Sequence, residues 1–287
     1  KIPSRRGNKK DNNGNDVVSK LNSKDLKKIS YDTKGKYYEI NENEIVQKLA
    51  QMGYPKVGEN DLGKKIKGTI CIIHGLGEHQ NRYKHVSVFF AHNGFQVYTY
   101  DQRGHGQSQG KRGYTPSLDH NLDDLDRVLK SISYRKLFLY GHSFGGNVLA
   151  NYLIRKQPNN VKGAILSSAW LKLASEPNFI VLFLAKIMNV IVPRLTRNNQ
   201  LDSFDLSNEI DSRIEYDNDP LTHNQISFRL FSEFYYAGIW AMNNSDRLET
   251  NTLMIHGEED RIISSSGTEK FAKNNSKYVD YKIFKNT

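Results

Sequence analysis

The chain has 287 residues, a hydrophobic content of 37% and a formal net charge of +10. This length allows one large core, and the composition is that of a globular protein. Residues 1–67 hold 16 Lys and Arg against 9 Asp and Glu, so +7 of the total charge of +10 lies there. No recognised nucleic-acid-binding motif accompanies this charge, so we expect a solvated tail and no nucleic-acid partner.

The N-terminal segment has little apolar surface to bury. Residues 1–25 mix lysines with five asparagines and few large apolar side chains. Burial of so little surface does not offset the entropy lost on ordering, so we predict a disordered basic tail. Residues 26–287 are expected to form one domain. Near its start, Tyr37–Ile40 has the composition of a strand, residues 45–52 have helical spacing, and residues 58–68 are typical of a loop.

The single cysteine excludes an intramolecular disulfide. Cys71 lies inside the apolar run Thr69–Ile73, where we expect a buried and unreactive thiol. A fold without disulfides needs no oxidising compartment, and no signal peptide is visible at the start of the sequence. We therefore expect a cytoplasmic protein.

From residue 68 onward, short apolar runs alternate with helical patterns. The expected strands are Thr69–Ile73, Phe95–Tyr100, Lys136–Tyr140, Gly163–Ser167, Asn251–His256 and Val279–Phe284, and the expected helices are 82–93, 117–133, 144–156 and 264–274. Such alternation predicts an α/β fold with a mainly parallel sheet. Because the strands are continuously apolar, helices should cover both faces of the sheet.

The alternation is interrupted between residues 170 and 248, a stretch too long for an ordinary connection. We predict a helical cap inserted there, before the strand Asn251–His256. Seven consecutive apolar residues, Phe179–Ala185, continue to Pro193 with one intervening lysine, Lys186. A membrane span needs about 20 predominantly apolar residues, so this segment predicts an apolar cap helix and no transmembrane helix.

The segment Gly141-His142-Ser143-Phe144-Gly145 matches the pattern G-x-S-x-G. It stands between a predicted strand and a predicted helix, the context in which this pattern forms a sharp turn that exposes a nucleophilic serine. We predict that Ser143 is the nucleophile of an acyl-transfer reaction. Gly141 and Gly145 are expected because a Cβ at either position would clash with neighbouring backbone.

An oxyanion formed during acyl transfer needs backbone donors. The N–H of Phe144 is the first candidate, because it follows the nucleophile at the positive end of a helix. A second donor should come from the loop after Thr69–Ile73, where His74-Gly75-Leu76-Gly77 lets the backbone approach a ligand. We nominate the N–H of Leu76.

Several segments of the sequence resemble motifs of one family, and they occur in the same order as in that family. The segments are His74-Gly75-Leu76-Gly77-Glu78-His79 with Arg82-Tyr83, then Asp101-Gln102-Arg103-Gly104-His105-Gly106-Gln107-Ser108, then the serine motif with Gly146, and finally Asp219-Pro220-Leu221. Together they resemble the monoacylglycerol lipase and lysophospholipase branch of the α/β-hydrolases, over about residues 68–287. The resemblance implies that His79, Arg103 and His105 shape loops and do not take part in chemistry.

The resemblance also places the acid of a Ser-Asp-His triad at Asp260, in an H-G-x-x-D pattern, with Glu258 and Glu259 as competitors. The base should be a histidine after the last strand. None of the nine histidines follows Asp260. We expect the natural chain to continue past Thr287 with this histidine; the alternative is a homologue that binds ligands without catalysis.

The apolar helix predicts a substrate with a long acyl chain, contacted by Phe179, Phe183 and Leu184. We expect a monoacylglycerol or lysophospholipid ester, cleaved through an acyl-enzyme. A short-chain esterase or a prolyl-type aminopeptidase is the enzymatic alternative, since the fold hosts many activities. No cofactor is expected, and no metal either, because His, Cys and acidic residues do not cluster. The same helix can rest on a membrane surface.

Overall fold

The computed structural model describes residues 3–4, 7–8, 66–134, 136–207 and 209–285. The chain divides into two units, residues 1–51 and 52–287. In the first unit, strands β1 (Pro3–Ser4) and β2 (Gly7–Asn8) pair antiparallel. The remainder of the tail predicted at residues 1–25, and the strand and helix predicted near residues 37–52, lie outside the described residues, as does most of the predicted loop at 58–68.

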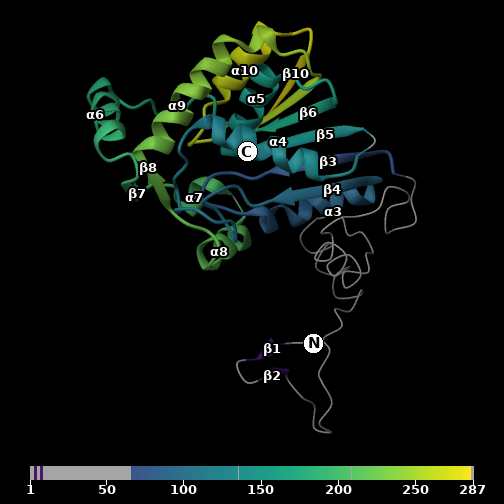
Figure 1. Ribbon diagram of the computed structural model, residues 1–287, viewed down its shortest axis with the longest axis horizontal. Coiled ribbons are helices and arrows are strands. Elements are labelled where there is room, and N and C mark those ends of the chain that lie inside the picture. Colours follow the sequence, from purple (N-terminus) through teal and green to yellow (C-terminus); the bar gives the residue numbers. More distant parts are fainter. Residues whose placement is uncertain (1–2, 5–6, 9–65, 135, 208, 286–287) are drawn as a thin grey trace. The chain divides into compact units, whose positions relative to one another are not determined.

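The second unit contains a six-stranded sheet in the order β10-β9-β6-β5-β3-β4, with every pair of neighbours parallel (Figure 1). Its strands are β3 (Gly68–Ile73), β4 (Phe95–Tyr100), β5 (Leu137–His142), β6 (Val161–Ser167), β9 (Thr252–Gly257) and β10 (Val279–Phe284). The α/β fold expected from the alternation is confirmed. Prediction and structure agree at both ends of β4 and β10, whereas β5 extends two residues further, into the serine motif.

Helices lie on both faces of this sheet, as the apolar strands predict. On one face, Ile70 and Ile72 of β3 form a cluster with Val97 that is covered by α3 (Lys84–His92), which follows the short 3-10 helix η1 (Gln80–Tyr83). On the other, Cys71 and Ile73 join the main core under α4 (Leu118–Ser131), α5 (Phe144–Lys156) and α10 (Ser265–Asn274). Cys71 is fully buried, and this burial raises the pKa of its thiol to about 12.

The segment between β6 and β9 contains several further elements. They are α6 (Phe179–Ile191), β7 (Thr196–Asn198), α7 (Ser203–Leu206), α8 (Ile210–Asn218), β8 (Gln225–Ser227), α9 (Phe228–Asn243) and the 3-10 helix η2 (Ser245–Arg247). Of these, α9 packs along α5 and buries Phe234 and Ala237 in the main core. The part of the segment that stands apart from the core is therefore shorter than the stretch 170–248 expected from the sequence.

Among the described residues, no helix combines the length and apolar character needed to cross a membrane. Helix α6 has 13 residues and is preceded by its N-cap residue Asn178, whose side chain accepts a hydrogen bond from the N–H of Val181. This cap and the following proline set the limits of the helix.

Two buried asparagines on α5 join it to α9. The amide of Asn147 donates to the carbonyl oxygens of Trp170 (2.6 Å) and Phe234 (2.9 Å), and that of Asn151 donates to the carbonyl of Ala237 (3.2 Å). Both side chains are fully buried. Because buried carbonyls are costly to leave unpaired, these amides fix the position of α9 against the helix that follows Ser143.

We predict that Asn147→Ala lowers the free energy of unfolding by about 2–4 kcal/mol, because two buried carbonyls lose a donor. Exposed Asn93, whose amide bonds the carbonyl of Phe89, provides the control, and Asn93→Ala should cost less than about 0.5 kcal/mol. Urea unfolding of both variants measures the difference. Equal losses for the two variants would contradict this role of Asn147.

Candidate active site

Ser143 stands at the point where the order of the sheet reverses. Strand β4 lies on one side of β3, and the chain then crosses to place β5 on the other side. The connections after β3 and β5 run to opposite sides there, and ligands usually bind at such a point, beyond the carboxyl ends of parallel strands. Leu76 follows β3 and Ser143 follows β5. The topology thus brings the predicted nucleophile and one predicted oxyanion donor to the same edge of the sheet.

The backbone of Ser143 is strained, as its motif predicts. Its φ is 49° and its ψ is −112°, a region that residues with a side chain rarely occupy. Backbone hydrogen bonds hold it there: its N–H donates to the carbonyl of Ser167 (2.9 Å), and its carbonyl accepts from Asn147 and Trp170. Ser143 precedes α5, but its side chain makes no capping hydrogen bond, so its hydroxyl is left available for chemistry.

Glycines permit the close contact between this turn and the sheet. A Cβ on Gly145 would lie 2.5 Å from the carbonyl oxygen of His74 and still nearer that of Ile73. A Cβ on Gly141 would lie 2.6 Å from the carbonyl oxygen of Gly145. These are backbone atoms that cannot move aside, so the expected need for glycine at both positions is confirmed.

The two nominated oxyanion donors come from different elements, one from the start of α5 and one from the loop after β3. The N–H of Phe144 is the first of α5, where an α-helix has no internal acceptor for it. In the loop after β3, the N–H of Gly75 is taken by the Glu78 carboxylate (2.6 Å), which also accepts from the Tyr83 hydroxyl (2.6 Å). Glu78 therefore shapes this loop, and the N–H of Leu76 is the next donor along it.

Asp260, the predicted acid, follows β9 and is held by several hydrogen bonds. Its Oδ1 accepts from the N–H groups of Ile262 (2.9 Å) and Ile263 (2.8 Å). Burial opposes ionisation of this carboxyl, but hydrogen bonds from His256 and from these two N–H groups outweigh it and hold its pKa below the ordinary value. The competing acids Glu258 and Glu259 are exposed.

His256, the first residue of the H-G-x-x-D pattern, contacts the predicted acid directly. Its Nε2 lies 3.2 Å from Asp260 Oδ2 and 3.1 Å from the carbonyl oxygen of Ile263, while its Nδ1 lies 2.8 Å from Thr268 Oγ1. The ring is buried and occupied on both nitrogens, so it holds Asp260 in place and is not free to act as a base. Within the described part of the chain, no hydrogen bond joins a histidine to the Ser143 hydroxyl.

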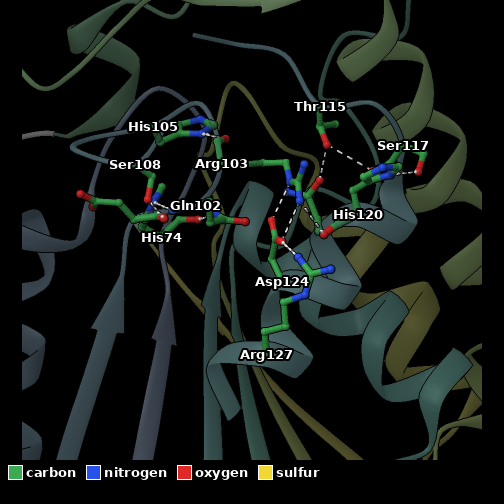
Figure 2. Close-up of polar contacts among 12 residues, drawn as sticks. His74, Gln102, Arg103, His105, Ser108, Thr115, Ser117, His120, Asp124 and Arg127 are labelled. Carbon is green, nitrogen blue, oxygen red and sulfur yellow. Dashed lines mark hydrogen bonds and ion pairs between the residues drawn. The ribbon is translucent and has the colours of Figure 1, made fainter. Parts of the chain in front are cut away.

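Three neutral histidines lie beside the turn. His105 lies 5.3 Å from His74 and 4.8 Å from His223 between ring centroids, and it stacks on Phe144 at 5.7 Å. His74 Nδ1 donates to the Gly75 carbonyl, so its Nε2 accepts the N–H of Gln102 (2.9 Å; Figure 2). A ring that accepts a hydrogen bond is uncharged.

Burial lowers the pKa of all three rings. It lowers that of His74, it lowers that of His223 to about 4, and with the neighbouring rings it holds that of His105 well below the usual range. The site is therefore lined by uncharged imidazoles at neutral pH.

The loops around the turn are held by polar contacts from distant segments. Arg103 pairs with Asp124 of α4 through two hydrogen bonds, which Figure 2 shows. His79 Nε2 lies 2.7 Å from Asp219 Oδ2, in the D-P-L segment, and the N–H of His223 donates to the carbonyl of Gly77 (2.8 Å). These contacts agree with the loop-shaping roles that the resemblance implies for His79 and Arg103.

The three residues nominated for acyl binding lie on the outer face of α6. Phe179 is 80% exposed, Phe183 is 62% exposed and Leu184 is 53% exposed. Ala185 is the one buried residue of this helix. The structure thus gathers apolar side chains at the surface of the cap helix. Over the described ranges, no group of three or more His, Cys, Asp and Glu side chains is arranged to hold a metal ion.

A parallel sheet with a strained serine at its switch point and an acid after a later strand defines a serine hydrolase of the α/β-hydrolase fold. Residues 64–287 match the family described as serine aminopeptidase S33, and the chain belongs to this family. A crystal structure of a monoacylglycerol lipase from Paleococcus ferrophilus superposes with a TM-score of 0.70 at 32% identity, covering 81% of this chain and 88% of that one.

Two relatives differ in how much of their length is matched. An uncharacterized abhydrolase domain-containing protein from Dictyostelium discoideum is 32% identical over 71% of this chain, but the match spans only 22% of that longer protein. A monoacylglycerol lipase from Mycolicibacterium smegmatis is 27% identical over 70% of this chain and 73% of its own length.

The neutral histidines predict a loss of stability in acid. Because the folded pKa of His223 is about 4, below the unfolded value near 6.5, the unfolded chain binds more protons between these pH values. The free energy of unfolding should therefore fall as the pH is lowered from about 6.5 to 4. His223→Gln should take up about one proton fewer on unfolding at pH 5, so its free energy of unfolding should change less steeply with pH. Denaturant midpoints measured across this pH range give that dependence. If the free energy of unfolding of wild type and variant changed equally with pH, the prediction would be contradicted.

Proposed function

We propose that this protein hydrolyses carboxylic esters of lipids, with Ser143 as the nucleophile. The observation that carries the proposal is the strained backbone of Ser143 at the switch point, with a hydroxyl that caps nothing. A conformation this costly persists where surrounding contacts impose it, and such strain gathers at functional sites.

In the proposed mechanism, Ser143 Oγ attacks the ester carbonyl and its proton passes to the base. The resulting oxyanion accepts hydrogen bonds from the N–H groups of Leu76 and Phe144, each worth about 2.7–4 kcal/mol in the transition state. The alcohol leaves with the proton, and water then releases the acid from the acyl-enzyme. We assign the base to a histidine after β10, where the resemblance expects it, with Asp260 orienting its ring.

The substrate class rests on the cap and on the relatives. The family description names a peptidase, whereas the relatives reported above include monoacylglycerol lipases. The apolar outer face of α6 favours the lipid substrate over a peptide or a short-chain ester, because it offers a long acyl chain a surface on which to leave water. We therefore propose a monoacylglycerol or lysophospholipid.

We also propose that α6 makes a peripheral contact with a membrane surface. Along the helix and just beyond it, large apolar side chains are exposed, among them Val190, Ile191 and Leu195. A group of exposed large apolar side chains such as this is characteristic of an interaction site. A lipid substrate residing in a bilayer would reach the enzyme at such a surface.

If α6 guides the acyl chain, kcat/KM should rise along a series of monoacylglycerols from short to long chains. The physical reason is the transfer free energy of about 0.8 kcal/mol per buried CH₂ group. Phe183→Asp should reduce kcat/KM for the long esters more than for the short ones, because the added carboxylate must lose water only when a long chain covers it. The measurement uses the full-length enzyme at substrate concentrations below micelle formation.

Arg197→Asp, at an exposed position of the cap outside α6, is the matched control and should leave the dependence on chain length unchanged. Ser143→Ala should abolish turnover of every ester. A preference for acetyl esters, or cleavage of amino-terminal amides alone, would contradict the lipid substrate. Turnover surviving in Ser143→Ala would contradict the nucleophile.

A further inference from the structure

A cavity of about 600 Å³ lies between the loop after β4, helix α4 and the segment that follows α6. Its charged lining consists of Arg103, Lys111, Arg127 and Arg194 together with Asp101 and Asp124. Four cations against two anions leave a formal charge of +2. This volume is in the range of small-molecule sites, and the residues do not include Ser143 or Asp260, so the cavity is separate from the candidate active site.

Both acids in the lining are already occupied. Asp124 accepts two hydrogen bonds from the guanidinium of Arg103, one of them at 2.7 Å between Nη2 and Oδ1 (Figure 2). Asp101 accepts one backbone N–H on each oxygen, from Gln80 and Gln107, both at 2.8 Å. The charge of Asp124 is therefore compensated by Arg103, and one acceptor site on each oxygen of Asp101 is taken by a backbone N–H.

Cationic groups with spare donors remain. The side chain of Arg127 is 76% exposed and reaches Asp124 only at 3.4 Å. Lys111 donates one hydrogen bond from Nζ to the carbonyl of Arg194, at 2.6 Å, which leaves two donors on its ammonium. The guanidinium of Arg194 lies over the ring of Tyr114, 5.2 Å from its centroid. These three side chains therefore give the cavity positively charged groups that can bind an anion.

The cavity adjoins the apolar surface of the cap. Arg194 comes three residues after the end of α6, and the exposed apolar residues Ile191 and Leu195 stand on either side of it. A protein surface that combines exposed apolar side chains with neighbouring cations is suited to an anionic bilayer, because the apolar part enters the interface while the cations meet the headgroups.

We propose that this cavity binds the phosphate of an anionic phospholipid headgroup while α6 lies in the membrane interface. The inference rests on the membrane contact proposed above, and it adds a preference for one class of lipid. Phosphate oxygens suit the guanidinium groups of Arg127 and Arg194, which present paired N–H donors in a plane. Lys111 adds a third cation beside them.

The test is co-sedimentation with vesicles of phosphatidylcholine alone and of phosphatidylcholine mixed with phosphatidylglycerol. Wild-type protein should bind the mixed vesicles more tightly. Arg127→Gln combined with Arg194→Gln should weaken that binding roughly tenfold and leave binding to the neutral vesicles unchanged. Thermal unfolding confirms that the variant is folded.

The control removes the same charge elsewhere. Lys130→Gln combined with Lys273→Gln neutralises two exposed cations, one of them on α4, outside the cavity. The control is needed because the chain carries +10 overall, and this general charge could by itself attract anionic vesicles. If the cavity recognises the headgroup, the control variant should change vesicle binding less than about twofold.

Equal losses in both double variants would overturn the inference, because general charge would then explain the binding. Equal binding of wild type to both kinds of vesicle would also overturn the inference. If free glycerol 3-phosphate nevertheless bound through these arginines, the ligand of the cavity would be a soluble phosphate and not a lipid headgroup. The readout needs no turnover and should be the same in Ser143→Ala, so a failure here is distinguishable from a failure of the proposed ester hydrolysis.

Discussion

The site depends on the close contact between the first turn of α5 and the end of β3. Gly145 lies against the carbonyl oxygens of Ile73 and His74, where a side chain does not fit. This contact holds the start of α5 against the sheet edge, and Ser143, which connects β5 to α5, has a φ of 49°. Strain in one residue is thus sustained by packing in several, which is how a folded protein keeps a costly conformation.

Buried rings and residues of the cap surround the turn. Phe144 packs between His105 and Phe234, so the residue that offers the oxyanion its N–H is fixed by buried rings. The cap reaches the same loops through His79–Asp219 and through His223, whose Nε2 donates to the carbonyl of Gly104 at 3.1 Å. These contacts hold the cap residues Asp219 and His223 against the loops that follow β3 and β4.

Local patterns in the sequence predicted the sheet, its helices and the position of the serine, because a strand, a glycine-framed turn and a helix each leave a local signal. Contacts between distant segments left none. The pair His79 and Asp219, which are 140 residues apart, is one such contact. The burial of α9 and the cationic cavity were missed for the same reason, since Arg103, Arg127 and Arg194 meet only through the fold.

The most direct test of the account is a crystal structure of the full-length protein after reaction with a long-chain alkyl fluorophosphonate. We predict a covalent bond between phosphorus and Ser143 Oγ, with the phosphoryl oxygen accepting hydrogen bonds from the N–H groups of Leu76 and Phe144. The same adduct should be absent from Ser143→Ala. An unmodified Ser143, an adduct on another side chain, or a phosphoryl oxygen directed away from both N–H groups would contradict the account.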